Sequence, residues 1–397
     1  MLANSGLSFT WLSGGRPMAD PVLFLDHAPA LGGAEQSLLL LLKHLHYYSR
    51  WQLHVACTGG RLAEKATALG VSVHIVSMPR LRRSIRAPVD WLRGVWDITR
   101  VARKIGARIL IANTVRAALY AAPAARLIQA PFVWYMRDFW LSESRPRRLW
   151  VDYLVKQLLC RAAVRVIANS EATARHLPCR EKVTVIYNGV EVEHYDPQIE
   201  GQPFRRHYGI PQQALVIGMV GRLRPWKGQD CFLRVLARVQ KKVPEVWGIV
   251  VGGTPLDEGE TYPRQLRQLA HSLGLEHCLI FTGQLEDVRP ALAAMDVFVH
   301  PGDPEPFGLV NIEAMAMSKP VVAFTHGALP EIVADGETGL LVHPGNEQAI
   351  ANAIVTLLEN RDLRTRLGRA GQQRVQSRFT VERMVKEFEA TLRDVLC

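Results

Sequence analysis

Two glutamates, Glu305 and Glu313, flank a short stretch whose residue types suit both a sugar and a phosphate. A Pro-Phe-Gly turn follows Glu305, and a helical pattern begins after Gly308. This order predicts one acid in a loop and the other on the helix that the loop opens. Backbone N–H groups of Gly308 and Leu309 would favour an anion at the helix start. The chemistry fits a nucleotide-sugar, although the same spacing also fits a loop acid and a solvated helix face.

Two cations, Arg222 and Lys227, lie on a predicted loop between a strand and a helix. An arginine can fork across two phosphate oxygens, and a lysine supplies a mobile point charge, so the pair suits a diphosphate. Solvated loop cations are the alternative interpretation of this pair.

A glycine pair, Gly32 and Gly33, stands at a predicted strand-to-helix turn, where backbone N–H groups can approach a phosphate closely. The third glycine of a dinucleotide fingerprint is missing, and no Gly-Lys-Ser/Thr follows as in a P-loop. The alternative is a plain tight turn, with Glu35 interacting favourably with the positive helix end.

Short apolar runs alternate with helical patterns along the whole chain, which predicts two doubly wound parallel sheets. The expected strands are Val22–Leu25, Gln52–Cys57, Val73–Val76, Arg108–Ala112, Phe132–Tyr135, Val164–Ala168, Val183–Tyr187, Leu215–Val220, Trp247–Val251, Leu279–Thr282, Val297–His300, Val321–Phe324 and Gly339–Val342. The expected helices are 34–46, 61–69, 229–242, 261–273, 287–295, 311–317, 329–334, 346–359 and 380–395.

A chain of 397 residues is too long for one ordinary core. We expect an N-terminal domain over 1–195, a C-terminal domain over 196–380 and a last helix over 381–397 that packs back toward the N-terminal domain. A turn-rich linker is expected at about 190–212. Residues 1–17 of the first range are expected to be disordered or not translated, with Met18 as the start. Two such sheets would face each other across a deep cleft, with ligands beyond the carboxyl ends of the strands.

The net charge of +11 is compatible with nucleic acid, an anionic membrane or phosphorylated ligands. No apolar run is long enough to span a membrane. No reading helix or aromatic platform supports nucleic-acid binding. The six scattered cysteines predict reduced cytosolic thiols and neither a disulfide framework nor a zinc site.

Residues 80–104 combine basic residues with Trp91, Trp96 and aliphatic side chains. This segment resembles a helix pair that lies on an anionic membrane surface. A solvated basic face that packs its apolar side on its own domain is the equal alternative. A second cluster, Arg145, Arg147 and Arg148 with Trp150, follows.

Taken in order, these motifs resemble glycosyltransferase family 4, the retaining group with the GT-B fold, over about residues 20 to 380. The sequence tags that carry the resemblance are Gly32-Gly33-Ala34-Glu35, Ile167 to Glu171, Ile186 to Val190, Val220 to Leu223 with Lys227-Gly228, Glu305 to Glu313, Gly327 to Val333 and Gly336 to Val342. Each tag is weak alone, but their order and spacing are specific.

The resemblance implies a role for each matching position and no metal or other cofactor. The positions are Arg222 and Lys227 for the donor diphosphate, Glu313 for the ribose, Glu305 for the transferred sugar, Phe307, Gly308 and Leu309 for backbone N–H contacts, and Gly32 and Gly33 for the opposite wall, with Gly32 and Glu35 on the acceptor side. Asp138 and Arg137 join Glu305 as the implied catalytic group. Arg137 is a departure, because many members have His here, and an arginine stays charged and cannot shuttle a proton.

The implied activity is a retaining transfer from a UDP-, GDP- or ADP-type nucleotide-sugar to a hydroxyl of a glycan or lipid-linked acceptor, in cell-surface polysaccharide or glycolipid synthesis. The protein would be cytoplasmic and peripheral on the inner face of the membrane. The alternatives are an epimerase-like or a catalytically degenerate nucleotide-sugar-binding protein of the same fold. The sequence does not indicate an oligomeric state.

Overall fold

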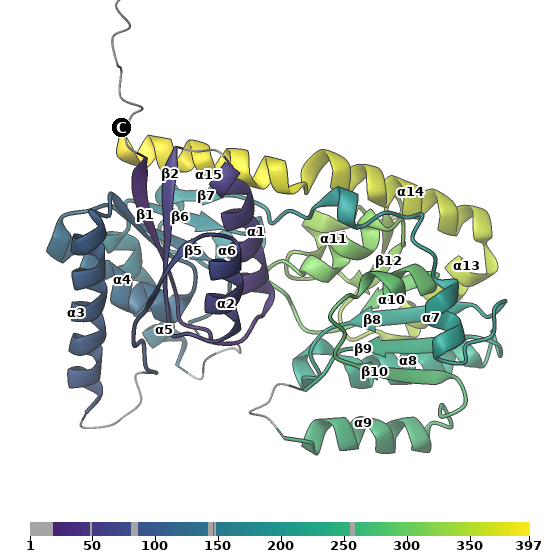
Figure 1. Ribbon diagram of the computed structural model, residues 1–397. Helices are drawn as coiled ribbons and strands as arrows, with labels where there is room; N and C mark the ends of the chain where they lie inside the picture. The colour runs from purple at the N-terminus through teal and green to yellow at the C-terminus, as the bar shows by residue number, and fades with distance from the viewer. Residues whose placement is uncertain (1–18, 48–49, 81–85, 142–145, 147, 255–258) are drawn as a thin grey trace, which may run out of the picture.

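The computed structural model describes residues 19–47, 50–80, 86–141, 146, 148–254 and 259–397, so the expectation for residues 1–17 lies outside the described chain. Two α/β domains stand side by side (Figure 1), each built on an all-parallel sheet, with strand orders β3-β2-β1-β4-β5-β6-β7 and β10-β9-β8-β11-β12-β13. The predicted pair of doubly wound parallel sheets is therefore confirmed.

The strands are short apolar runs whose side chains are largely buried, as in parallel sheets that helices cover on both faces. In the first sheet they are β1 Asp20–Asp26, β2 Trp51–Cys57, β3 Ser72–Ile75, β4 Ile109–Ala112, β5 Phe132–Met136, β6 Arg165–Ala168 and β7 Val183–Val185. In the second they are β8 Val216–Val220, β9 Trp247–Val251, β10 Leu279–Gly283, β11 Val297–His300, β12 Val321–Phe324 and β13 Gly339–Val342.

Helices α3, α4 and α5 pack on one face of the first sheet, and α1, α2 and α15 pack on the other. The helices of this half are α1 Gly33–Tyr47, α2 Arg61–Ala68, α3 Ala87–Ile105, α4 Val115–Ile128, α5 Leu149–Ala162 and α6 Glu171–Arg175, with 3-10 turns at Arg180–Lys182 and Val192–His194. The sequence predicts a helix pair in 80–104, but the described part of this segment forms one helix, α3. Residues 81–85, Arg145 and Arg147 lie outside the described residues. Helix α3 continues because Val95, Ile98 and Ala102 keep a buried helical stripe unbroken.

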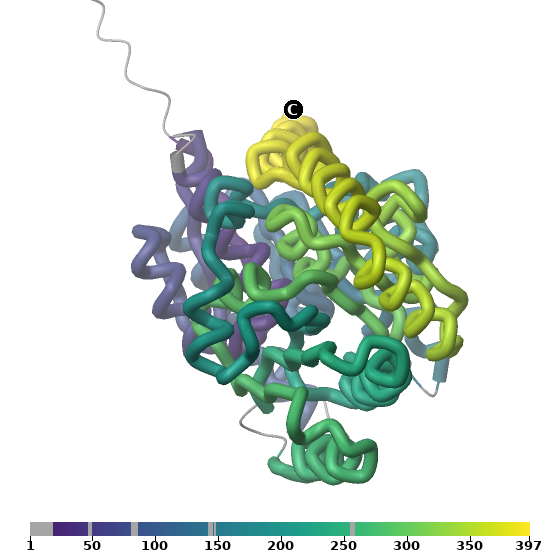
Figure 2. Tube along the Cα trace, turned by 90° about the vertical axis from the view of Figure 1, so that its right-hand side faces the viewer, coloured from purple at the N-terminus to yellow at the C-terminus, as the bar shows by residue number. Residues whose placement is uncertain are grey.

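The second half carries α7 Gln202–His207, α8 Gln229–Gln240, α9 Thr261–Ser272, α10 Arg289–Ala294, α11 Leu309–Ala316, α12 Leu329–Ile332, α13 Glu347–Glu359, α14 Arg361–Arg378 and α15 Val381–Leu396, with a 3-10 turn at Pro225–Lys227. Helices α14 and α15 follow one another along one side of both domains (Figures 1 and 2). The last helix, α15, packs against α1, and the Phe388 ring lies 6.0 Å from Phe24 and 5.7 Å from Tyr135. The chain end thus completes the core of the first domain.

The chain passes between the domains twice, and the two passages touch. Val190 forms an isolated parallel bridge with Thr380. A Cβ on Gly189 would lie 2.4 Å from the Thr380 carbonyl oxygen, so only glycine allows this approach. The crossing segments therefore form one joined hinge region.

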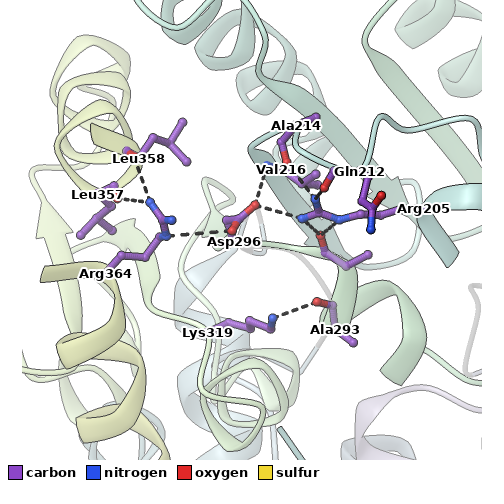
Figure 3. A network of polar contacts seen from close by, with 11 residues as sticks. Arg205, Gln212, Ala214, Val216, Ala293, Asp296, Lys319, Leu357, Leu358 and Arg364 are labelled. Atoms are coloured by element: carbon purple, nitrogen blue, oxygen red, sulfur yellow. Dashed lines mark hydrogen bonds and ion pairs between the residues drawn. The ribbon is translucent and has the colours of Figure 1, made fainter. Parts of the chain in front are cut away.

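A polar network at the amino end of the second sheet ties the predicted linker to its domain (Figure 3). Arg205 of α7 donates to the Ala294 carbonyl and pairs with Asp296 at 3.1 Å, while the Val216 N–H donates to the same Asp296 carboxylate at 2.8 Å. Lys319 donates to the Ala293 carbonyl nearby. The network lies at the edge opposite to the strand ends expected to bind ligand, so we assign it to stability.

The expectation of six reduced thiols is wrong for one pair, because a disulfide joins Cys160 to Cys179. The end of α5 and the loop before β7 lie side by side, with the two Cα atoms 5.9 Å apart. Cys57, Cys231 and Cys278 are buried free thiols, and Cys397 is an exposed one. The pairing depends on tertiary proximity that sequence spacing does not show.

Candidate active site

Lys227 and Glu305 meet at the carboxyl edge of the second sheet. The Lys227 ammonium forms an ion pair with Glu305 Oε1 and also lies 4.5 Å from the Trp226 ring centroid. Burial opposes ionisation of Glu305, but the charge of Lys227 counters it, so the pKa of Glu305 lies below its usual value. Glu305 is thus held as a buried carboxylate with a cation beside it.

His300 ends β11 directly behind this ion pair, with Nε2 3.5 Å from Glu305 Oε1. Its Nδ1 lies 3.1 Å from the Asn311 side-chain nitrogen. Burial lowers the pKa of His300 to about 4, so the ring is neutral near pH 7. A neutral ring packs beside Glu305 without competing for the Lys227 charge.

Helix α11 starts next to the same carboxylate. Gly308 has φ 85°, and a Cβ there would lie 2.6 Å from the Asn311 side-chain nitrogen, which explains the glycine. Asn311 donates to the Gly308 carbonyl at 3.0 Å and fixes the turn. Because the helix begins at Leu309, its first N–H groups have no carbonyl within the helix to bind. These free N–H groups can receive an anion. The Phe307 side chain just before the turn is buried.

The glycine turn of the first domain faces Arg222 of the second. A Cβ on Gly32 would lie 3.9 Å from an Arg222 guanidinium nitrogen, and one on Gly33 would lie 3.6 Å from the Leu309 side chain. The Gly32 N–H donates to Glu35 Oε2 at 2.7 Å, which shapes the turn. The carboxyl edges of both sheets therefore face one another, with the glycine turn opposite Arg222 and the start of α11.

Glu313 lies on α11, one turn beyond the helix start. It is partly buried, and burial raises the pKa of Glu313 to about 7, against an opposing hydrogen bond with Tyr195. Tyr195 follows the passage out of the first domain. A carboxyl group that ionises near neutral pH can accept hydrogen bonds from ligand hydroxyl groups once it is ionised.

Arg137 is held inside the first domain. It is 5% exposed, and its guanidinium carbon lies 3.7 Å from the Tyr135 ring centroid. Nε donates to Asn113 at 2.6 Å, and Nη1 donates to Ser37 at 2.9 Å and to Asn188 at 2.8 Å. Nη2 has no hydrogen-bond partner among the described residues. Asp138 follows it at the end of β5 and is partly exposed.

Two buried acids accompany Arg137. Asp26 accepts hydrogen bonds from Asn113 at 2.6 Å and from the Ala28 N–H at 2.9 Å. Burial, followed by repulsion from Glu35, raises the pKa of Asp26 to about 7, and burial also raises the pKa of Glu35. The chain Arg137–Asn113–Asp26 therefore supports the β1–α1 loop that carries the glycine turn.

The domains also touch beside the site. Ser170 donates to the Pro306 carbonyl at 2.6 Å. The Glu331 carboxylate of α12 accepts from the Glu171 and Ala172 N–H groups at 2.8 and 2.7 Å. Glu331 thus caps a helix of the other domain, and this contact fixes how the glycine turn and α11 approach each other.

The structure brings most sequence-derived positions to this one region: Arg222, Lys227, Glu305, Phe307, Gly308, Leu309, Glu313, Gly32, Gly33 and Glu35. Arg137 is buried in its own domain, where its charge acts on Glu35. Sequence reasoning missed the supporting contacts of Asn311, Tyr195, Ser170 and Glu331, whose partners are distant in the chain. In the described residues, no three His, Cys, Asp or Glu side chains are grouped so that they could hold a metal ion.

Two facing parallel-sheet domains, with cations, glutamates and a helix start at their shared edge, define an α/β protein of the GT-B class. The family model for Glycosyltransferase Family 4 matches residues 31–194, and that for Glycosyl transferases group 1 matches residues 202–374. Together these ranges span most of the chain, which belongs to this family of glycosyltransferases.

A D-inositol 3-phosphate glycosyltransferase of Stackebrandtia nassauensis is 38% identical over 205 residues, which are 50% of this chain and 46% of the relative. The chain thus spans about half the length of such curated relatives. The lipopolysaccharide core biosynthesis mannosyltransferase LpsB of Rhizobium meliloti is 27% identical, over 66% of this chain and 73% of its own. The crystal structure of Anabaena HepE in complex with UDP and glucose superimposes with a TM-score of 0.81 at 29% identity, covering 94% of this chain and 99% of that one.

Proposed function

We propose that this protein transfers a sugar, with retention of configuration, from a nucleotide-diphosphate-sugar to a hydroxyl of a glycan or lipid-linked acceptor. The observation that carries the proposal is the Lys227–Glu305 pair beside the start of α11. Arg222 and Lys227 would neutralise the leaving diphosphate together with the helix start, so no metal is required. The UDP and glucose bound to the similar HepE support this donor class.

The reaction we favour takes place on one face of the sugar. The bond from the anomeric carbon to the phosphate oxygen breaks, and the acceptor oxygen bonds to the same face. The acceptor proton passes to the departing phosphate oxygen. Glu305 orients the sugar in this scheme, and no covalent intermediate forms on the protein.

Glu305→Gln tests the assignment of Glu305. A sugar-orienting acid should leave turnover reduced by about 10- to 100-fold and the product anomer unchanged, whereas loss of a nucleophile should abolish turnover. Glu359→Gln, at the exposed end of α13, is the matched control. A trapped glycosyl adduct on Glu305 would reverse the assignment.

Hydrolysis and transfer over a panel of UDP-, GDP- and ADP-sugars test the function as a whole. We expect nucleotide release from one donor class, faster with acceptor present. Interconversion of nucleotide-sugars without release would favour the epimerase-like alternative. Tight nucleotide-sugar binding with no turnover would favour the degenerate one.

The lipid-linked acceptor is supported by the outer surface of the α3–α4–α5 layer. Of the eleven exposed large hydrophobic residues in the described chain, ten lie on this layer or directly after it. They are Val89, Leu92, Trp96, Leu127, Leu149, Trp150, Tyr153, Leu154, Leu158 and Val164. A concentration of this kind on one face is typical of an interaction surface.

The charges of this layer support an anionic bilayer as the surface that it meets. Arg93, Arg103 and Arg161 are exposed on it. The one acid of α5, Asp152, is buried and paired with Lys156 at 2.7 Å. No helix in the described part of the chain could span a membrane. The contact that we propose is a peripheral one, and it extends the surface expected from residues 80–104 onto α5.

Flotation with anionic vesicles tests this contact. We expect salt-sensitive binding that Trp150→Ser with Leu154→Ser weakens, while Arg366→Ser on α14 leaves it unchanged. Equal binding by all three proteins, or none by the wild type, would contradict the proposal.

We place the protein in the cytoplasm, on the inner face of the membrane and in cell-surface glycan synthesis. The Cys160–Cys179 disulfide is the feature that argues for an oxidising compartment. Cell fractionation with thiol labelling would distinguish the cytoplasm from an oxidising compartment.

A further inference from the structure

A hollow of about 500 Å³ lies at the carboxyl ends of β1, β2 and β3, outside the region around Glu305. Helix α3 and the start of α4 close its sides. Its lining is His27, Pro29, Thr58, Asp97, Arg100 and Arg116, with the segment 75–79 and Val101. This size suits a small-molecule ligand.

Arg116 is the unusual group in this hollow. It stands in the first turn of α4, a turn without an acidic residue, where the helix dipole disfavours a cation. Its side chain is partly buried, and burial followed by repulsion from Arg80 lowers the pKa of Arg116. Among the groups that act on it in the described chain, no carboxylate offsets its charge. An unpaired, partly desolvated cation of this kind is costly unless an anion meets it.

His27 shows how positive the hollow is. Its Nδ1 lies 2.7 Å from the Thr114 hydroxyl, at the N-cap of α4. Burial, then Arg116 and Arg80, lower the pKa of His27 to about 4. The ring stays neutral near pH 7 chiefly because it is buried, and the charges of Arg116 and Arg80 add to this effect.

The other charged residues of the hollow do not cancel the positive charge of the arginines. Asp97 is the one acidic residue among the described residues of the lining, and its carboxylate lies 3.9 Å from Arg100, which also lines the hollow. In the part of the lining that the structure describes, no further acid is left to balance Arg116, and Arg80 nearby adds to the positive charge. The hollow therefore attracts anions.

Its position connects it to the proposed transfer site. His27 and Pro29 belong to the β1–α1 loop, and the same loop continues into Gly32 and Gly33, which face Arg222 and Leu309. A molecule in the hollow therefore lies on the first-domain side, along the loop that forms the wall opposite the donor residues.

We propose that this hollow binds an anionic substituent, a phosphate or a carboxylate, of the acceptor, with Arg116 as its main contact. The acceptor role rests on the proposed function, whereas anion binding does not. The volume leaves room for a group of sugar size beside the anion.

Inorganic phosphate is the probe for the first test, with thermal unfolding followed at constant ionic strength against chloride. We expect phosphate to raise the Tm of the wild type, with at least tenfold weaker apparent affinity in Arg116→Met. Arg126→Met, at the exposed end of the same helix, is the matched control and should respond like the wild type. Acetate in place of phosphate separates the two anion classes.

Lys227→Met removes a donor cation and identifies which site the phosphate occupies. We expect the phosphate shift to persist in Lys227→Met. A shift that disappears there and persists in Arg116→Met would place the phosphate at the donor residues and overturn the proposal. Without phosphate, Arg116→Met should melt no lower than the wild type, which a purely structural arginine would not allow.

Turnover separates this inference from the proposed function. Arg116→Met should hydrolyse donor at the wild-type rate and show at least a tenfold higher KM for an anionic acceptor. If no nucleotide-sugar is turned over, the proposed function fails, and the phosphate titration still decides the anion site. Equal phosphate affinity in the wild type and in Arg116→Met would overturn the proposed anion site.

Discussion

Lys227 and Glu305 form an ion pair between the loop after β8 and the loop before α11. Their side chains are 16% and 7% exposed, so the two charges depend on each other more than on water. The cation suited to a diphosphate and the acid suited to a sugar are thus coupled electrostatically. A change at either residue should affect both ends of a nucleotide-sugar.

Lys227→Met should leave Glu305 as a buried carboxylate without its main cation. We expect the free energy of unfolding to fall by roughly 3 kcal/mol, as when one partner of a buried pair is removed. Donor turnover should fall about 100- to 1,000-fold, because the leaving charge loses a preorganised cation. Urea unfolding and nucleotide release measure the two effects. Lys241→Met, exposed at the end of α8, is the control.

The stability loss in Lys227→Met should depend on pH. Lys227 helps to lower the pKa of Glu305, so their pairing stabilises the fold above the ordinary pKa of glutamate and is lost as the pH falls through the lowered value. The gap between wild type and variant should therefore narrow in acid. A gap that stays constant from neutral to acidic pH would contradict this electrostatic origin.

Glu313 predicts a different pH dependence. Burial raises the pKa of Glu313 to about 7, so the group is largely protonated at mildly acidic pH and ionised at mildly basic pH. The carboxylate is the better acceptor for ribose hydroxyls. Donor KM should fall about 3- to 10-fold as the pH rises through 7. Glu313→Gln should raise KM and abolish this dependence.

The same shift has the opposite effect on stability. Because the folded-state pKa of Glu313 lies above its ordinary value of 4.5, its contribution is complete below that pH and is lost as the pH rises through about 7. Glu313→Gln should therefore gain stability relative to the wild type on the basic side. Parallel pH curves for the two proteins would argue against a buried carboxyl at this position.

Apolar runs bounded by polar residues predict the strands well, and β9, β11, β12 and β13 have the expected bounds. Helices α4 and α5 are not among the predictions. The α4 sequence is rich in alanine and contains Pro123, so its periodicity is weak. The α5 sequence carries apolar residues on its exposed side as well, which hides the stripe that marks a buried face.

Residue types predict the site better than its internal contacts. Arg222, Lys227 and the glutamates are visible as chemistry on loops, but the Lys227–Glu305 contact spans 78 residues and follows only from the fold. The sequence shows that Arg137 stands where many family members have His, but it does not show that the arginine is buried against Tyr135. Tertiary packing decides which charges meet, and a single sequence does not encode that locally.

Glu331 should control how the two domains close. Its carboxylate accepts two N–H bonds from the start of α6, each of the charge-assisted kind that contributes about 1.5–3 kcal/mol. In Glu331→Ala we expect a larger radius of gyration by small-angle X-ray scattering and a higher donor KM. Glu337→Ala, exposed in the same region, should behave like the wild type. An unchanged radius with a raised KM would assign Glu331 a direct ligand contact instead.

Arg137 should act through the first domain and not through the transferred sugar. Removing its guanidinium in Arg137→Met leaves Ser37 and Asn113 without this donor and leaves Asn188 with the Ser37 hydroxyl, which we expect to cost roughly 3 kcal/mol of unfolding free energy. Arg137→Lys should recover little, because an ammonium cannot reproduce the planar fork. Arg108→Met, which removes an exposed arginine at the start of the same sheet, is the control.

The distinguishing measurement for Arg137 is donor hydrolysis in variants that remain folded. Because Arg137 supports the β1–α1 loop through Asn113 and Asp26, we expect KM for the donor to rise while the pH profile of kcat stays unchanged. Arg137→His should be destabilised like Arg137→Met, because the site is shaped for three separate hydrogen bonds from a guanidinium. Wild-type stability in Arg137→Met combined with abolished hydrolysis would instead place this residue against the substrate.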